Sequence, residues 1–204
     1  ALAAEALAEL ARELRSADVT LSHVDVGGGL GIPQRDTPAP AFEDYVDAVT
    51  APLADLDVDV LSEPGRAIVG PAGVLLTRVI YLKRRADHSF ALVDGAMNDL
   101  LRPALYAAWH DILPCRRDPD ARPEILDVVG PVCETADFLG RGRRLALAEG
   151  DLLAVMDAGA YGFTMASNYN SRPRCAEVLV TAAGPVLARA RETVDDLMRG
   201  ETTN

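Results

Sequence analysis

The feature that most constrains the fold is an order of strand, glycine-bearing loop and helix that recurs in the first third of the chain. An apolar run, VTLSHVDV, ends in the loop GGGLG; a helical pattern follows in AFEDYVDAVTAPLADL, and a second strand-like run, DVDVL, ends in SEPGR. This repetition is typical of parallel βα units, in either a barrel or a doubly wound sheet. Both architectures bind ligands at the carboxyl ends of their strands, so the two loops are candidate binding loops.

From about residue 74 the pattern changes to short β-rich runs separated by turn residues. VLLTRVIYLKR, SFALVDG, EILDVVG and DLLAVMDAG follow one another, and AEVLVTAAGPVLARA contains two strand-like stretches joined by a short loop. These runs predict a mostly antiparallel β domain whose last two strands form a hairpin. We therefore expect an α/β part over residues 1–77, the β domain over 78–190, and a short helix and tail over 191–204, with Thr193 as the helix N-cap.

Composition narrows the class of function. With 204 residues, 49% hydrophobic content and 25% charged residues, the chain has a globular composition and can bury a core. Its formal net charge of -11 and the absence of long basic runs argue against nucleic acid or an anionic membrane as a partner. The longest apolar stretch is interrupted by Arg78 and is too short to cross a bilayer. A cytoplasmic protein that handles small molecules is the expectation.

Cysteines and histidines point to no metal site or disulfide framework. Three cysteines, Cys115, Cys133 and Cys175, are few and unevenly spaced, and the three histidines form no ligand cluster with them. The amino-terminal residues lack an initiator methionine and open within a periodic helical pattern, so we interpret the sequence as a fragment of a longer polypeptide.

Several loops allow both a functional and a purely structural interpretation. The glycines of GGGLG offer backbone amides without Cβ obstruction, which suits a phosphate, although a tight turn needs the same residues. In SEPGR, Glu63 and Arg66 face either a ligand or solvent across a Pro-Gly corner. Cys133, in GPVCETAD, is either a small buried hydrophobe or a reactive loop thiol.

Taken in order, these loops resemble a known enzyme family. The segments DVGGGLGI, EPGR, DGAMNDLLRPALY, GPVCETADFLG and GDLLAVMDAGAYGFTMASNYNSRPR are similar to the C-terminal half of diaminopimelate decarboxylases, pyridoxal-phosphate enzymes of the alanine-racemase-like fold type. The resemblance covers nearly all of residues 21–200. It implies that residues 1–77 are the C-terminal portion of a (β/α)8 barrel and that the parent is a homodimer with active sites shared between subunits. It also implies decarboxylation of meso-diaminopimelate to L-lysine.

The resemblance also assigns roles to individual residues. Cys133 is implied to return a proton to the α-carbon after carbon dioxide leaves, and Glu63 to face the pyridine nitrogen of the cofactor. The implied cofactor-binding residues are Gly28, Gly29, Glu63, Pro64, Gly65, Arg66 and Tyr161. The implied substrate-binding residues are Arg66, Arg102, Tyr106, Glu134 and Tyr161.

Substrate chemistry supports these assignments, with alternatives left open. Diaminopimelate carries a distal carboxylate and a distal ammonium, which an arginine fork and Glu134 can pair with respectively. A relative acting on ornithine would need only an anion there, so Arg102 favours diaminopimelate. A sister decarboxylase for ornithine, arginine or a related amino acid, or a non-catalytic truncated relative, remains the alternative.

One departure from the family pattern concerns lysine. The family's Schiff-base lysine lies in the N-terminal part of the barrel, and Lys83 is the only lysine of this sequence. Its position within YLKRR predicts an exposed strand residue instead, and His23, His88 and His110 do not match the family's ring-stacking histidine. Residues 1–204 alone are therefore expected to be catalytically inactive.

Overall fold

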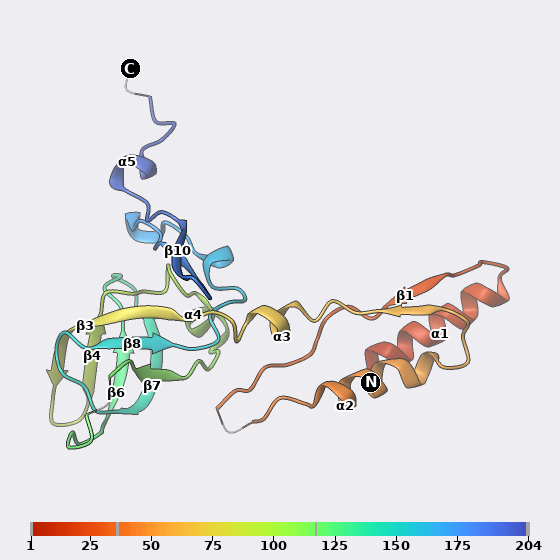
Figure 1. Cartoon of the computed structure of the whole chain (residues 1–204), viewed down its shortest axis with the longest axis horizontal. Coiled ribbons are helices and arrows are strands. Elements are labelled where there is room, and N and C mark those ends of the chain that lie inside the picture. Colours follow the sequence, from red (N-terminus) through yellow and green to blue (C-terminus); the bar gives the residue numbers. More distant parts are fainter. Residues whose placement is uncertain (1, 36, 117, 203–204) are drawn as a thin grey trace. The chain divides into compact units, whose positions relative to one another are not determined.

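The computed structural model describes residues 2–35, 37–116 and 118–202, which divide into two compact units between Ala72 and Gly73 (Figure 1). The boundary expected between residues 77 and 78 is therefore too late. Strand β3 runs without a break from Leu75 to Arg84, so a boundary at 77 would cut a continuous strand. Each unit has its own apolar core and is described separately.

The first unit contains the predicted parallel βα arrangement. Strands β1 and β2 pair in parallel, with Val24 opposite Val60, and helices α1 and α2 are amphipathic. Its core consists of small and branched side chains, namely Ala8, Ala11, Val24, Leu53 and Leu56. The elements are α1 (Leu2–Ser16), β1 (His23–Asp25), α2 (Phe42–Thr50), η1 (Ala51–Leu53), β2 (Asp59–Leu61) and α3 (Gly65–Val69).

The second unit is built around a six-stranded sheet in the order β5-β8-β3-β4-β6-β7. All neighbouring pairs are antiparallel except β4 and β6, so the prediction of a mostly antiparallel domain is confirmed. The strands are β3 (Leu75–Arg84), β4 (Ser89–Val93), β5 (Ile112–Pro114), β6 (Glu124–Val129), β7 (Phe138–Leu145) and β8 (Leu152–Val155).

This sheet curls until it is nearly closed. The two terminal strands of the order, β5 and β7, contact each other, and the strands wind around a common interior in Figure 1. Inward-facing aliphatic side chains from every strand fill that interior, including Val79, Ala91, Leu126, Leu139 and Leu153. Buried and more exposed residues alternate along β8 and the first half of β3, so one face of each strand points to the interior; the outward residues include apolar ones such as Leu76, Ile80 and Leu152. The loops between strands are thereby held at the rim.

The chain then adds a hairpin and a short helix. Strands β9 (Glu177–Thr181) and β10 (Gly184–Arg189) pair antiparallel, as predicted. Helix α5 (Val194–Leu197) begins after Thr193, whose side chain and that of Asp196 form a reciprocal capping box, so the predicted N-cap is confirmed. None of the helices in the described ranges has both the length and the apolar character that a membrane span needs.

Candidate functional site

In the first unit, the two glycine-bearing loops lie against each other at the carboxyl ends of β1 and β2. The amide of Glu63 donates to the carbonyl of Gly27 over 2.8 Å, and the hydroxyl of Ser62 donates to the same carbonyl over 3.0 Å. From α2, the hydroxyl of Tyr45 donates to the carbonyl of Gly28 over 2.8 Å. The parallel pairing therefore brings both predicted loops to one edge, as expected from the sequence.

The glycines of the first loop are required for two different physical reasons. A Cβ at Gly28 would lie 2.7 Å from the carbonyl oxygen of Glu63, so no larger residue fits between the loops. Gly27 and Gly29 have φ values of +70° and +94°, a region that favours glycine, and a Cβ on either would meet open space. Within the described residues, the amides of Gly28 and Gly29 make no hydrogen bond. Such amides beside open space fit an anion such as a phosphate.

The second loop carries four of the predicted site residues. Glu63 and Gly65 are exposed, and Pro64 and Arg66 are half-buried. The amide of Gly65 donates back to the carbonyl of Glu63 over 2.8 Å, which folds the loop sharply before α3 begins. The carboxylate of Glu63 therefore lies on the loop that contacts the glycine loop, and Arg66 follows in the first turn of α3.

In the second unit, a buried carboxylate joins two of the predicted loops. Asp137 is 4% exposed; its Oδ1 accepts from the amide of Met97 at 2.7 Å and its Oδ2 from the amide of Val132 at 2.6 Å. Burial raises the pKa of Asp137, and these amide donors oppose the rise. Asp137 thus ties the loop that bears Cys133 to the turn that precedes Arg102.

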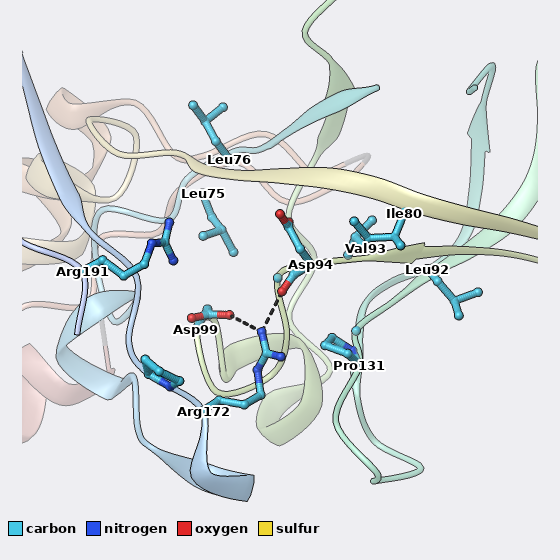
Figure 2. Close-up of a pocket in the computed structure, with 13 residues that line it drawn as sticks. Leu75, Leu76, Ile80, Leu92, Val93, Asp94, Asp99, Pro131, Arg172 and Arg191 are labelled. Atoms are coloured by element: carbon cyan, nitrogen blue, oxygen red, sulfur yellow. Dashed lines mark hydrogen bonds and ion pairs between the residues drawn. The ribbon is translucent and has the colours of Figure 1, made fainter. Parts of the chain in front are cut away.

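Arg172 attaches a third loop to the same turn. Its Nε donates to Asn98 Oδ1 over 2.9 Å and its Nη2 to the carbonyl of Asp94 over 2.7 Å, while Asp99 lies 3.9 Å from Nη2 (Figure 2). Asn98 in turn donates to the carbonyl of Ser167 over 3.2 Å. Burial raises the pKa of Asp99, and Arg172 opposes the rise. Three loops distant in sequence are therefore joined through side chains.

Arg102 is almost fully buried, with 6% of its surface exposed, at the first position of helix α4 (Arg102–Tyr106). Its Cζ lies 5.9 Å from the ring centre of Tyr161, and its Nη1 lies 3.4 Å from Nε2 of His110. Tyr161 has a positive φ of 57°, which is uncommon for an aromatic residue and often marks a functional position. The structure thus brings together two residues predicted from sequence, Arg102 and Tyr161.

The remaining predicted residues of this unit lie at the surface. Cys133 and Glu134 are exposed on the loop that Asp137 holds. The hydroxyl of Tyr169 donates to Glu134 over 3.4 Å. Tyr106 is 62% exposed at the end of α4. Within the described residues, no hydrogen bond or ring contact joins Tyr106 or Cys133 to another predicted residue.

A cavity of about 500 Å³ lies beside Arg172, and Figure 2 shows its lining. Its walls combine aliphatic side chains of β3 and β4 with charged groups, among them Leu75, Ile80, Asp94, Asp99 and Arg191. None of the residues predicted for the site lines it. Asp94 already accepts from the Thr77 hydroxyl and the Arg78 amide, each over 2.7 Å. The polar groups here hold the loops together, so we do not assign the cavity as the substrate site.

Lys83 is exposed on β3, which confirms the sequence prediction for this residue. His23 and His88 are exposed, whereas His110 is buried.

Four residues that hold the loops of the site together were not predicted: Tyr45, Asp137, His110 and Arg172. A single sequence gives no periodic or spacing signal for them, because each contacts a partner distant along the chain, which for His110 is Met156.

Comparisons with known proteins identify the family of the chain. The family model of the C-terminal sheet domain of pyridoxal-dependent decarboxylases matches residues 17–159. The chain is 53% identical over 201 residues to diaminopimelate decarboxylase of Pseudomonas fluorescens, covering 98% of this chain and 48% of that protein. It is 50% identical over 197 residues to the Vibrio cholerae enzyme, covering 96% of this chain and 47% of that one. The chain spans about half the length of the curated relatives it matches.

Solved structures give the same result. The crystal structure of diaminopimelate decarboxylase from M. jannaschii in complex with L-lysine matches with a TM-score of 0.93 and 35% identity, covering 99% of this chain and 48% of that one. The Helicobacter pylori enzyme complexed with L-lysine matches with a TM-score of 0.88 and 38% identity, covering 96% and 48% respectively. The chain belongs to the family of pyridoxal-dependent decarboxylases.

Proposed function

We propose that this chain forms the C-terminal half of a diaminopimelate decarboxylase, which converts meso-2,6-diaminopimelate to L-lysine and carbon dioxide. The observation that carries the proposal is Arg102, held almost fully buried beside Tyr161 in a chain 53% identical to such an enzyme. A buried arginine offers a planar pair of donors for a carboxylate, and diaminopimelate has a distal carboxylate that ornithine and arginine lack.

Pyridoxal phosphate fits the loops of the first unit. When bound, the cofactor supplies the electron sink that decarboxylation of an amino acid requires. Free amides of Gly28 and Gly29, with open space beside Gly27 and Gly29, suit its phosphate. The exposed carboxylate of Glu63 can pair with a protonated ring nitrogen. We assign Pro64, Gly65 and Arg66 of this unit, and Tyr161 of the second unit, to cofactor binding as well.

The residues of the second unit have substrate and proton-transfer roles. We assign carboxylate binding to Arg102 and, from the first unit, Arg66, ammonium binding to Glu134, and further substrate contacts to Tyr106 and Tyr161. Cys133 is exposed on the loop that is fixed by hydrogen bonding to Asp137, where its thiol can donate a proton. After the bond between the α-carbon and the carboxylate breaks and carbon dioxide leaves, the Cys133 proton goes to the α-carbon.

We further propose that the parent enzyme combines a (β/α)8 barrel with this β domain, is a cytoplasmic homodimer, and shares its active sites between subunits. The parallel β1–β2 pair and its two loops support the barrel assignment, because barrels place ligand loops at the carboxyl ends of their strands.

The test is a substrate comparison with the complete enzyme and its cofactor. Carbon dioxide release is measured on meso-diaminopimelate, ornithine and arginine, for the wild type and for Arg102→Ala. We expect diaminopimelate to be strongly preferred. Arg102→Ala should raise the KM for diaminopimelate by about tenfold or more while cofactor affinity stays unchanged. Equal rates on ornithine, or no release from diaminopimelate, would overturn the proposal.

A further inference from the structure

His110 is a buried histidine with no role in the function proposed above. It is 1% exposed and precedes β5 in the chain. Its Nδ1 lies 2.8 Å from the carbonyl oxygen of Met156, and its Nε2 lies 3.4 Å from Nη1 of Arg102. Both ring nitrogens therefore have a polar partner, one from β8's carboxyl end and one from α4.

The two partners determine where the imidazole proton lies. A backbone carbonyl accepts only, so Nδ1 must carry the proton. A guanidinium donates only, so Nε2 must be the unprotonated acceptor. Both contacts can be made only by the neutral tautomer with its hydrogen on Nδ1. His110 thus offers Arg102 one acceptor in a fixed direction.

The surroundings keep this histidine neutral. Burial lowers the pKa of His110, and the positive charges of Arg102 and Arg143 lower it further. The carbonyl of Met156 and the carboxylate of Asp157 oppose that change. Protonation would remove the acceptor and place a third positive charge beside the two arginines.

Local backbone geometry brings His110 back to Arg102. Helix α4 ends at Tyr106; the next residue, Ala107, adopts the left-handed conformation with φ 51°, and the amide of Ala108 donates to the carbonyl of Arg102 over 3.3 Å. The chain therefore turns back on the helix just before His110. An arginine side chain has many rotamers, and an acceptor in a fixed place removes much of that freedom before a ligand binds.

We propose that His110 is a positioning residue that holds the Arg102 guanidinium in the orientation that receives the distal carboxylate of the substrate. This inference rests on the substrate-binding role proposed above for Arg102. Because its two ring nitrogens contact Met156 and Arg102, His110 should act on substrate binding only through Arg102.

Two conservative variants separate the two contacts of His110. In His110→Gln the amide oxygen can take the place of Nε2 and accept from Arg102, whereas the contact with Met156 is lost. In His110→Asn the amide nitrogen can take the place of Nδ1 and donate to Met156, whereas the side chain is too short for Arg102. The matched control is His88→Gln, because His88 is exposed and has no place in the site.

The experiment measures KM and kcat for meso-diaminopimelate, together with the thermal midpoint, in the complete enzyme with its cofactor. We expect His110→Asn to raise KM by about tenfold with kcat changed less than about threefold, and His110→Gln to stay within about threefold of wild type. Adding His110→Asn to Arg102→Ala should raise KM little further, because the missing arginine has nothing left to position.

The outcomes distinguish this inference from the proposed function. If KM changes in step with the thermal midpoint across the variants, His110 is only structural and the inference is wrong. The same conclusion follows if His110→Asn and Arg102→Ala multiply their separate effects on KM. If the wild type fails to decarboxylate diaminopimelate, the proposed function fails first, and that is visible without any variant.

Discussion

Removal of the Asp137 carboxylate should release two loops at once. In Asp137→Ala the amides of Met97 and Val132 lose acceptors at 2.7 and 2.6 Å, and no water has ready access because the side chain is 4% exposed. In Asp137→Asn one of the two amides faces an NH₂ group instead of an oxygen, so only one bond is lost.

The loss of local stability in Asp137→Ala follows from the two hydrogen bonds that are removed and from the cost of burying the carboxylate charge. A hydrogen bond to a charged group contributes about 1.5–3 kcal/mol, so the gross loss in Asp137→Ala is about 3–6 kcal/mol. The raised pKa of Asp137 shows that desolvation of the carboxylate offsets part of this. We therefore expect a net loss of about 2–4 kcal/mol in the local free energy of opening, and about half of that in Asp137→Asn.

Hydrogen exchange measures this local opening without assuming two-state unfolding of the whole enzyme. Exchange at Met97 and Val132 should accelerate by about 30- to 1000-fold in Asp137→Ala. The matched control is Asp118→Ala, since Asp118 is exposed and its carboxylate accepts a hydrogen bond from the amide of Asp120. If exchange at both amides stays within about threefold of wild type, Asp137 does not hold the loops and the reasoning is refuted.

Three further predictions concern other parts of the chain. Gly28→Ala should weaken cofactor binding, measured by absorbance titration, because the added Cβ would lie 2.7 Å from the Glu63 carbonyl oxygen. The control Gly31→Ala should bind the cofactor normally, because its Cβ meets nothing nearer than 3.9 Å. Equal losses of cofactor affinity in the two variants would contradict this prediction. Cys133→Ala should lower kcat for lysine formation by about 100-fold with cofactor absorbance unchanged; wild-type kcat would assign the thiol to packing. Hydrogen bonds from Arg174 lower the pKa of Glu192 to about 2. The stabilisation of the folded state by the Glu192 carboxylate is therefore fully present above about pH 4.5 and is lost as the pH falls through about 2. Glu192→Gln should remove that part of the acid dependence of the thermal midpoint, and an unchanged dependence would show that the ion pair does not form.

Strands with a regular apolar pattern were predictable, and those without one were missed. The runs that contain β3, β4, β6 and β8 read as strands from their aliphatic content. Strand β7, FLGRGRRL, mixes glycine and arginine, so its sequence reads as a loop. Tertiary packing overrides that local preference: Leu139 is fully buried in the sheet interior, and the Arg143 guanidinium lies over the Trp109 ring at 3.1 Å from its centre.

Sequence alone predicted which loops would carry chemistry, because strand, glycine and charge follow each other locally in GGGLG and SEPGR, and small and ionisable residues lie together around Arg102 and Cys133. Tertiary structure alone decided what holds these loops. The Asp137 carboxylate reaches an amide 40 residues away, Arg172 reaches Asn98 across 74 residues, and His110 reaches Met156 across 46. Short-range patterns specify elements and turns, whereas a polar group finds such a partner only after the sheet has closed and excluded the water that would otherwise satisfy it.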